Sequence, residues 1–198
     1  VAAMPVLIAP GWIQGPFNTP GKTSLSLDAG IRTGQTWFPT FAVFKNSPSV
    51  TDEAIVDFVR SGWQHGGYLM KPENFRVTSN WGAMESNGLY HLGVMLPEFK
   101  DAALWRDTAV SRTMAMIEQQ VYPDGAQVEL APGYHGVSLS NFLGVMRLAA
   151  ANSLPVPEDF AQRLAGMFDY YLKIADPDLR TPNLNDSGSG SVIGQLRR

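Results

Sequence analysis

Residues 81–96 read WGAMESNGLYHLGVML, and this stretch decides the fold class. Met84, Leu89, Leu92 and Val94 spread the apolar positions over most sides of the helix that it would form. A helix that is apolar all round is buried among other elements. Pro97 ends the stretch because proline cannot continue a helix. The pattern predicts a central helix that is surrounded by further helices.

The neighbouring stretches show a helical period of their own. Thr51, followed by Asp52 and Glu53, has the form of a helix start, with a hydroxyl cap and two carboxylates near the positive end of the helix dipole. No alternating pattern of strands and helices is present. Five helices predict an all-α domain, built from antiparallel helix hairpins that stack as a solenoid or close into a ring. The four flanking helices are expected at about 51–64, 98–121, 137–151 and 157–175.

The two ends of the chain differ from this helical part. Residues 1–50 are rich in Gly, Pro and aromatic residues without a sustained period, which predicts an irregular lead-in segment. Residues 51–176 hold the helices, and residues 177–198 read as a loop or linker. The chain starts at Val1 rather than Met and stops at Arg198 without a closing element, so we expect a piece of a longer protein.

Composition and charge limit the partners, segments and cofactors to be expected. The 198 residues carry a net charge of −3 and no run of basic residues, which argues against nucleic-acid binding. Residues 1–10 are apolar, but Pro5 interrupts them and no basic residue precedes them, so neither a signal peptide nor a membrane span is expected. The chain has no cysteine, and nothing in the sequence requires a cofactor or a metal.

Polar residues concentrate first on the central helix. Asn80, Met84, Asn87 and His91 follow one another at steps of four, three and four residues and therefore share one face. A buried polar row needs hydrogen-bond partners, and a ligand could supply them. The alternative is that Asn80 caps the helix and His91 is a hydrogen-bonded core histidine.

The second concentration is the stretch DGAQVELAPGYHG at residues 124–136. It combines Asp124, Glu129, Tyr134 and His135 with glycines that let the backbone approach a ligand closely. The alternative is a polar surface loop in which Asp124 forms a turn and Tyr134 packs at a helix start.

Seven motifs, taken in order over roughly residues 35–190, resemble one family. The sequence is similar to the heparinase II/III-like polysaccharide lyases, which include oligoalginate lyases. The motifs are NWGAMESNGL at 80–89, LPEF at 96–99, QxxxDG at 120–125, ELAPGYH at 129–135, and upstream WFPTF at 37–41, SPSVTDE at 47–53 and GGYL at 66–69.

The resemblance implies a fold and a location. Members of this family have an incomplete α/α toroid followed by a largely antiparallel β-sandwich, of which this chain would supply helices of the toroid. The β-sandwich would belong to the same parent protein and would contribute a catalytic histidine. A bacterial, periplasmic or secreted location is implied as well.

The resemblance also implies a reaction, β-elimination at a uronic acid within an acidic glycan. Asn80 matches the family's carboxylate-binding asparagine, and Tyr134 matches its catalytic tyrosine, which serves as base and acid. A phenol is a weak base at pH 7, so we expect positive charge beside it. His135 and Arg76 are the first candidates, followed by Lys71 and Arg32.

Further substrate-binding residues are Trp81, Arg76, Glu129, His91 and Asn87. Glu85 would lie about 140° around the helix from Asn80 and is expected to be a structural ion-pair partner.

Two other functions stay open. A glycoside hydrolase on an α/α toroid would use Asp124 or Glu129 as general acid and Glu85 as base. A glycan-binding helical module would need no catalytic residue.

Overall fold

The computed structural model describes residues 25–196, and these are mainly helical. Two isolated bridges, Val121 with Gln127 and Arg180 with Ser191, are the only β-pairing among them. The predicted all-α class is confirmed. The elements are α3 (Leu25–Ile31), the π-helix η1 (Arg32–Thr36), α4 (Trp37–Phe44), α5 (Asp52–Met70), the 3₁₀ turn η2 (Pro72–Asn74), α6 (Asn80–Met95), α7 (Ala102–Gln120), α8 (Pro132–Ala151), α9 (Phe160–Lys173) and α10 (Val192–Leu196).

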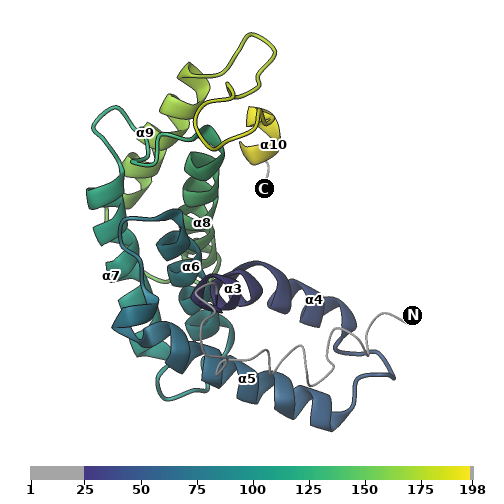
Figure 1. The fold of residues 1–198 in the computed structure, drawn as a ribbon. Helices are drawn as coiled ribbons and strands as arrows, with labels where there is room; N and C mark the ends of the chain where they lie inside the picture. The colour runs from purple at the N-terminus through teal and green to yellow at the C-terminus, as the bar shows by residue number, and fades with distance from the viewer. Residues whose placement is uncertain (1–24, 197–198) are drawn as a thin grey trace.

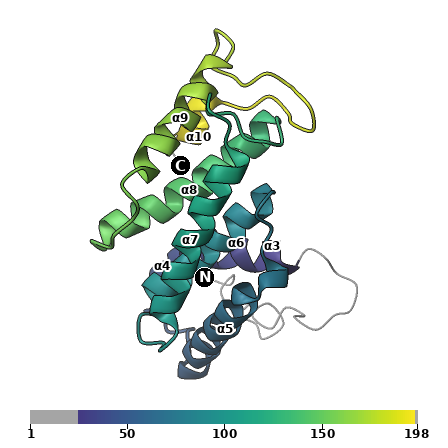
Figure 2. The same ribbon diagram turned by 90° about the vertical axis from the view of Figure 1, so that its left-hand side faces the viewer.

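Helix α6 is the centre of the domain, as its sequence predicts. It packs against α3, η1, α5, α7 and α8, and 13 of its 16 residues are buried. Helices α6 to α9 form an upright stack, and α3 to α5 extend from its lower end (Figure 1). The turned view places α7 and α9 on the side of the stack opposite α3 and α4 (Figure 2).

The predicted irregular lead-in is wrong for residues 25–44, which form α3, η1 and α4. Aromatic packing stabilises these helices: Phe41 stacks on Phe58 of α5 with ring centroids 4.5 Å apart, and Trp37 and Phe38 are buried. Such tertiary contacts have no signature in the local period of the sequence. The remainder of the predicted segment, residues 1–24, lies outside the described residues.

Two predicted helix boundaries also differ. Helix α5 continues through Gly66 to Met70, beyond the predicted end at about residue 64. Gly66 serves packing rather than helix termination: the Trp105 ring lies so close that a Cβ atom at Gly66 would be 2.4 Å from it. Helix α8 starts at Pro132, a residue that fits the first helical turn. Tyr134 therefore lies in the first turn of a helix rather than in a loop.

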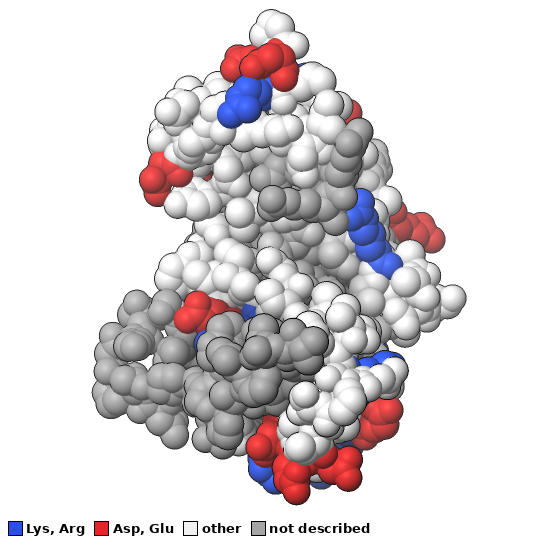
Figure 3. All heavy atoms as spheres, turned by 90° about the vertical axis from the view of Figure 1, so that its right-hand side faces the viewer, with Lys and Arg blue, Asp and Glu red and all other residues white. Residues whose placement is uncertain are grey.

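Charged side chains are unevenly distributed over the face that carries α3, α4 and α10. They gather at its upper and lower ends, and few lie across its middle (Figure 3). None of the helices within residues 25–196 is both long and apolar enough to cross a membrane.

Candidate active site

Asn80 and Tyr134 stand at the N-terminal ends of α6 and α8, which meet at the same end of the helical stack. Glu129, three residues before α8, joins the two ends. Its carboxylate accepts hydrogen bonds from the Asn80 backbone nitrogen at 2.7 Å and from Asn80 Nδ2 at 2.8 and 3.1 Å. Asn80 is buried, so this contact fixes the orientation of its amide.

A chain of buried amides holds Glu129 in turn. Gln127 Oε1 accepts a hydrogen bond from the Glu129 backbone nitrogen, and Gln127 Nε2 donates to Gln120 Oε1, each at 3.0 Å. Gln120 Nε2 donates to the carbonyl oxygens of Val77 and Ser79, just before α6. Both glutamines are buried. The network therefore ties the end of α7, the loop after it and the start of α6 into one rigid support for Asn80.

The Tyr134 hydroxyl donates a hydrogen bond to Asp186 Oδ2 at 2.9 Å. Two further contacts hold the Asp186 loop on the start of α8: Asn185 Nδ2 donates to the Leu130 carbonyl, and the Gly133 nitrogen donates to Ser187 Oγ, both at 2.6 Å. The hydrogen bond to Asp186 and the charge of that carboxylate raise the pKa of Tyr134. Among the described residues, then, Tyr134 is held as a neutral phenol.

The structure does not place positive charge on His135. Its ring is buried against α9, stacked on Tyr171, and its Nε2 lies 3.1 Å from the Met167 carbonyl oxygen. Burial lowers the pKa of His135 to about 4, so the ring is neutral at pH 7. Since α8 begins before Tyr134, its neighbour His135 points to the helix interface instead of the site. The expected cation beside the phenol is therefore not this residue.

Arg76, the other candidate cation, lies in an ion pair with Glu85. The Arg76 guanidinium is 2.9 Å from Glu85 Oε1, donates to Ser26 Oγ at 2.7 Å, and lies over the Trp81 ring, 4.8 Å from its centroid. Glu85 is fully buried, which confirms the predicted structural ion pair. Arg76 and Trp81 thus contact each other beside Asn80, and Arg76 covers a face of the Trp81 ring.

Asn87 and His91, the remaining residues of the predicted polar row, line a cavity of about 490 Å³ between η1, α6 and α8. Asn87 Nδ2 donates to Asn141 Oδ1 at 3.0 Å, and His91 Nδ1 contacts the Asn87 carbonyl at 2.9 Å. Burial lowers the pKa of His91. The structure therefore separates the row into Asn80 at the helix end and two residues in a cavity further along α6.

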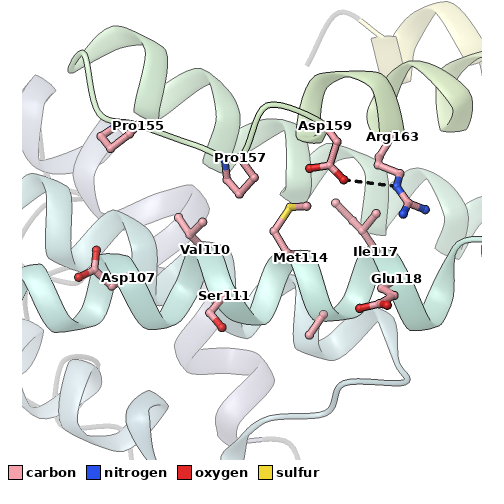
Figure 4. Close-up of a pocket in the computed structure, with 11 residues that line it drawn as sticks. Asp107, Val110, Ser111, Met114, Ile117, Glu118, Pro155, Pro157, Asp159 and Arg163 are labelled. Atoms are coloured by element: carbon pink, nitrogen blue, oxygen red, sulfur yellow. Dashed lines mark ion pairs between the residues drawn. The ribbon is translucent and has the colours of Figure 1, made fainter.

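A larger cavity, of about 670 Å³, lies between α7 and the start of α9 (Figure 4). Asp159 and Arg163 form an ion pair of 3.7 Å at its edge. Asp107 and Glu118 add further carboxylates, and none of the predicted site residues lines it. An acidic glycan would be repelled there, so the end of α6 and α8 is the better candidate site. Within residues 25–196, no group of three or more acidic or histidine side chains is arranged to hold a metal ion.

The buried histidines predict how stability depends on pH. Burial lowers the folded-state pKa of both His65 and His135 to about 4, whereas an unfolded histidine titrates near 6.5. Between these values the unfolded chain binds more protons, so the free energy of unfolding falls as the pH drops from about 6.5 to 4. We expect a loss of about 2.5 kcal/mol for each of these two histidines, measured by urea unfolding at pH 7.5 and 4.5. His135→Gln should remove the share of this pH dependence that belongs to His135, while His65 and His91 keep theirs; an unchanged dependence would contradict the assignment.

Comparison with known proteins identifies the family. The family described as Heparinase II/III N-terminus matches residues 16–197, nearly the whole chain. The chain belongs to this family. The resemblance predicted from the motifs is confirmed.

The relatives are bacterial heparin-sulfate lyases. The chain is 34% identical over 151 residues to one from Pedobacter heparinus and 27% identical over 191 residues to one from Bacteroides thetaiotaomicron. These matches cover 75% and 90% of the chain but only 23% and 27% of the relatives, so the chain spans about a quarter of their length.

Solved structures of the family share the fold. A crystal structure of heparinase III superposes with a TM-score of 0.78 at 26% identity, covering 88% of this chain and 29% of that one. A mutant heparan sulfate lyase from Pedobacter heparinus gives a TM-score of 0.67 at 34% identity, over 82% of this chain and 25% of that one. The helices are therefore part of the helical toroid of this family, as expected.

Some residues of the site have too weak a sequence signal to be predicted. Asp186 lies 52 positions after Tyr134 in a polar, glycine-rich loop of a common kind. Gln120 opens the QxxxDG motif, but that motif assigns it no role, and Gln127 lies within the polar stretch at 124–136 without a signal of its own. Their role follows from the isolated bridge between Val121 and Gln127, which brings the two glutamines together.

Proposed function

We propose that this chain is the helical part of a polysaccharide lyase, which cleaves a uronic-acid-containing glycan by β-elimination. The observation that carries the proposal is the pair of held side chains at one end of α6 and α8. Asn80 is fixed by Glu129, and Tyr134 is hydrogen-bonded to Asp186. The family and the names of its relatives point to the same chemistry.

The reaction needs a donor on the uronate carboxylate. The C5 proton lies next to that carboxylate and is weakly acidic until the charge of the group is offset. Asn80 Nδ2 has two N–H bonds. In the proposed role, one stays with Glu129 and the other binds a uronate oxygen, where it stabilises the developing enolate.

Tyr134 performs the proton transfers in this scheme. Its oxygen takes the C5 proton while its own proton passes to Asp186, with which it already shares a hydrogen bond. The electrons of the C5–H bond form the C4–C5 double bond, and the C4–O bond breaks. Tyr134 then protonates the leaving oxygen, and Asp186 returns the proton to Tyr134. The raised pKa of Tyr134 keeps the phenol protonated at the start of the reaction and makes its oxygen the stronger base for the C5 proton.

The helix ends favour an anionic substrate. Asn80 opens α6, and Tyr134 lies in the first turn of α8, so the positive ends of two helix dipoles meet where the uronate would bind. This arrangement takes the place of the cation that the sequence led us to expect on His135. The histidine that the family's β-sandwich contributes would complete the site.

The glycan is proposed to be of the heparan sulfate type. The relatives are named heparin-sulfate lyases, which favours this glycan over alginate. Arg76 and Trp81, next to Asn80, are proposed to contact the sugar beside the uronate. A β-sandwich domain of the same parent protein and a periplasmic or secreted location belong to the same proposal.

The hydrolase alternative finds less support. It requires Glu85 as a base, but that carboxylate is fully buried and paired with Arg76. Of its two candidate acids, Glu129 is engaged by Asn80 through three contacts, and Asp124 accepts a hydrogen bond from the Ala126 nitrogen in a turn. These carboxylates already have partners within the fold, which favours the lyase.

Asp186→Asn tests the proposed proton relay. Removing the carboxylate should lower the pKa of Tyr134, because the group that disfavours the phenolate is lost. Turnover should nevertheless fall, since Asp186 can no longer take up the proton. The pKa is read from phenolate absorbance during alkaline titration, as the difference between Asp186→Asn and Asp186→Asn with Tyr134→Phe. An unchanged pKa together with unchanged turnover would exclude the relay.

A panel of acidic polysaccharides tests the substrate class. The complete protein is mixed with heparan sulfate, hyaluronan or alginate, and the unsaturated product is followed by its ultraviolet absorbance. We expect the fastest rise with heparan sulfate. A faster rise with alginate would overturn the proposed glycan and keep the lyase, whereas no rise with any uronate would overturn both.

A further inference from the structure

The loop at residues 181–190, which carries Asp186, is closed at its base and docked at its tip. Its base is closed by Thr181, whose backbone nitrogen donates to the Gly190 carbonyl oxygen at 2.8 Å and whose Oγ1 accepts from the Gly190 nitrogen at 2.9 Å. Its tip lies on the start of α8, at the upper end of the stack (Figure 1). Asp186 is exposed, so its place on Tyr134 depends on what holds the residues beside it.

Ser187 supplies a cap that α8 lacks locally. Ala131 precedes the helix, and its methyl side chain cannot accept a hydrogen bond from the N–H groups of the first turn, which have no partner within the helix. One of these groups, the Gly133 nitrogen, donates to Ser187 Oγ at 2.6 Å. A Cβ atom at Gly133 would lie 2.8 Å from that oxygen, so a larger residue there would displace the hydroxyl. A serine 54 positions away thus does the work of an N-cap residue.

Asn185 makes a second contact, with the segment between Glu129 and α8. Its Nδ2 donates to the Leu130 carbonyl oxygen at 2.6 Å. Both Asn185 and Leu130 have a φ angle of 53°, in the left-handed region that residues other than glycine rarely adopt. Such a backbone persists where the surrounding structure holds it, and it is frequent at functional sites. The hydrogen bond therefore joins two strained residues and ties the loop to the segment that carries Glu129.

We propose that Asn185 and Ser187 are positioning residues, which hold the Asp186 carboxylate on the phenol. Each is next to Asp186 in the sequence, and each bonds a backbone group within four residues of Tyr134. Neither bonds the phenol itself among the described residues, so both act through Asp186. With both neighbours fixed, the exposed carboxylate keeps its 2.9 Å hydrogen bond to the phenol. The inference rests on the proposed function for the role of Asp186 in proton transfer.

The pKa of Tyr134 reports whether Asp186 stays in place. The hydrogen bond to Asp186 and the charge of its carboxylate raise this pKa, and the charge of Glu129 adds a smaller effect. Ser187→Ala removes the cap, and Asn185→Gly removes the amide while glycine keeps the left-handed backbone. Each should lower the pKa, in the direction expected for Asp186→Asn, because the carboxylate is no longer held on the phenol. The pKa is read by alkaline titration of the complete protein, as the difference from the same variant with Tyr134→Phe.

The same two variants should also be slower enzymes. We expect kcat to fall about tenfold and KM to change less than about twofold, because a displaced proton acceptor loses part of its contribution to the chemical step. Gly133→Ala should have the same effects without removing a hydrogen-bonding group, since its added Cβ atom displaces the Ser187 hydroxyl. Alanine favours a helix, so α8 should be kept.

Ser189→Ala is the matched control. Ser189 belongs to the same loop, but its Oγ accepts a hydrogen bond from Arg180 Nε instead of contacting α8. Its loss should leave both the pKa of Tyr134 and kcat unchanged. Circular dichroism of each variant shows whether it has kept its helices.

Combination with Asp186→Asn separates positioning from a general effect on structure. Once the carboxylate is gone, Ser187→Ala and Asn185→Gly should lower the pKa of Tyr134 no further. An unchanged pKa in both single variants, or an equal further fall in the Asp186→Asn background, would overturn the proposal. The titration needs no turnover, so the positioning role can fail while β-elimination stands. A wild-type protein that forms no unsaturated product from any uronate would overturn the proposed function instead.

Discussion

Tyr134→Phe is expected to lower kcat of the complete protein about 10³-fold, with KM changed less than threefold. The variant lacks the group that is proposed to take the C5 proton and to protonate the leaving oxygen, and such groups contribute about 10²- to 10⁴-fold. Folding should be preserved, because Tyr134 is partly exposed and its hydroxyl donates only to Asp186 among the described residues. The rate is measured from the absorbance of the unsaturated product.

Tyr122→Phe is the matched control for this prediction. Tyr122 is 47% exposed at the end of α7, and losing its hydroxyl should leave kcat unchanged. If Tyr134→Phe keeps more than a tenth of the wild-type kcat, Tyr134 is not the proton-transfer residue. If the wild-type protein and Tyr134→Phe both bind the glycan and neither turns it over, a binding module is favoured instead.

Asn80→Ala is expected to lower kcat/KM about 10²- to 10³-fold. The substitution removes the amide that is proposed to bind the uronate carboxylate, and loss of one such preorganised donor has a cost of this size. It also leaves the Glu129 carboxylate without its side-chain partner, so a negative charge would face the substrate. Initial rates over a range of glycan concentrations, with the same absorbance readout, measure the effect.

Asn152→Ala controls for the loss of an amide. Asn152 follows α8 at the other end of the helix, and within residues 25–196 its side chain bonds only the Leu148 carbonyl, so kcat/KM should stay within twofold of wild type. Urea unfolding of Asn80→Ala separates a loss of folding from a loss of catalysis. A folded Asn80→Ala with more than a fifth of the wild-type kcat/KM would contradict the role of Asn80.

The sequence predicts the central part of this fold well, because burial leaves a strong pattern there. Residues 81–96 are apolar on most sides, and α6 is indeed the buried hub. The helical lead-in was missed, since α3 and α4 depend on contacts with α5 and α6 that no local period reveals. The start of α8 was placed five residues late because Gly133 and Gly136 suggested a loop, although Pro132 is a favourable first helical residue.

The sequence predicts those residues of the candidate site that lie in a family-like motif and carry a side chain suited to the reaction. Asn80, Glu129 and Tyr134 come together at one end of α6 and α8, as their shared motifs suggested. The sequence predicts His135 as a source of positive charge for the phenol, but successive residues of a helix point about 100° apart, so the imidazole faces α9 instead. Asp186 is brought to the phenol by a long-range loop contact that only the structure reveals.

The central claim is that the bond breaks by elimination, and the ratio of two products tests it most directly. The complete protein is incubated with heparan sulfate, and new reducing ends and ultraviolet absorbance of the C4–C5 double bond are measured in the same sample. We predict one unsaturated unit for each new reducing end, and neither product with Tyr134→Phe. Reducing ends that form without the absorbance would show hydrolysis and contradict the account.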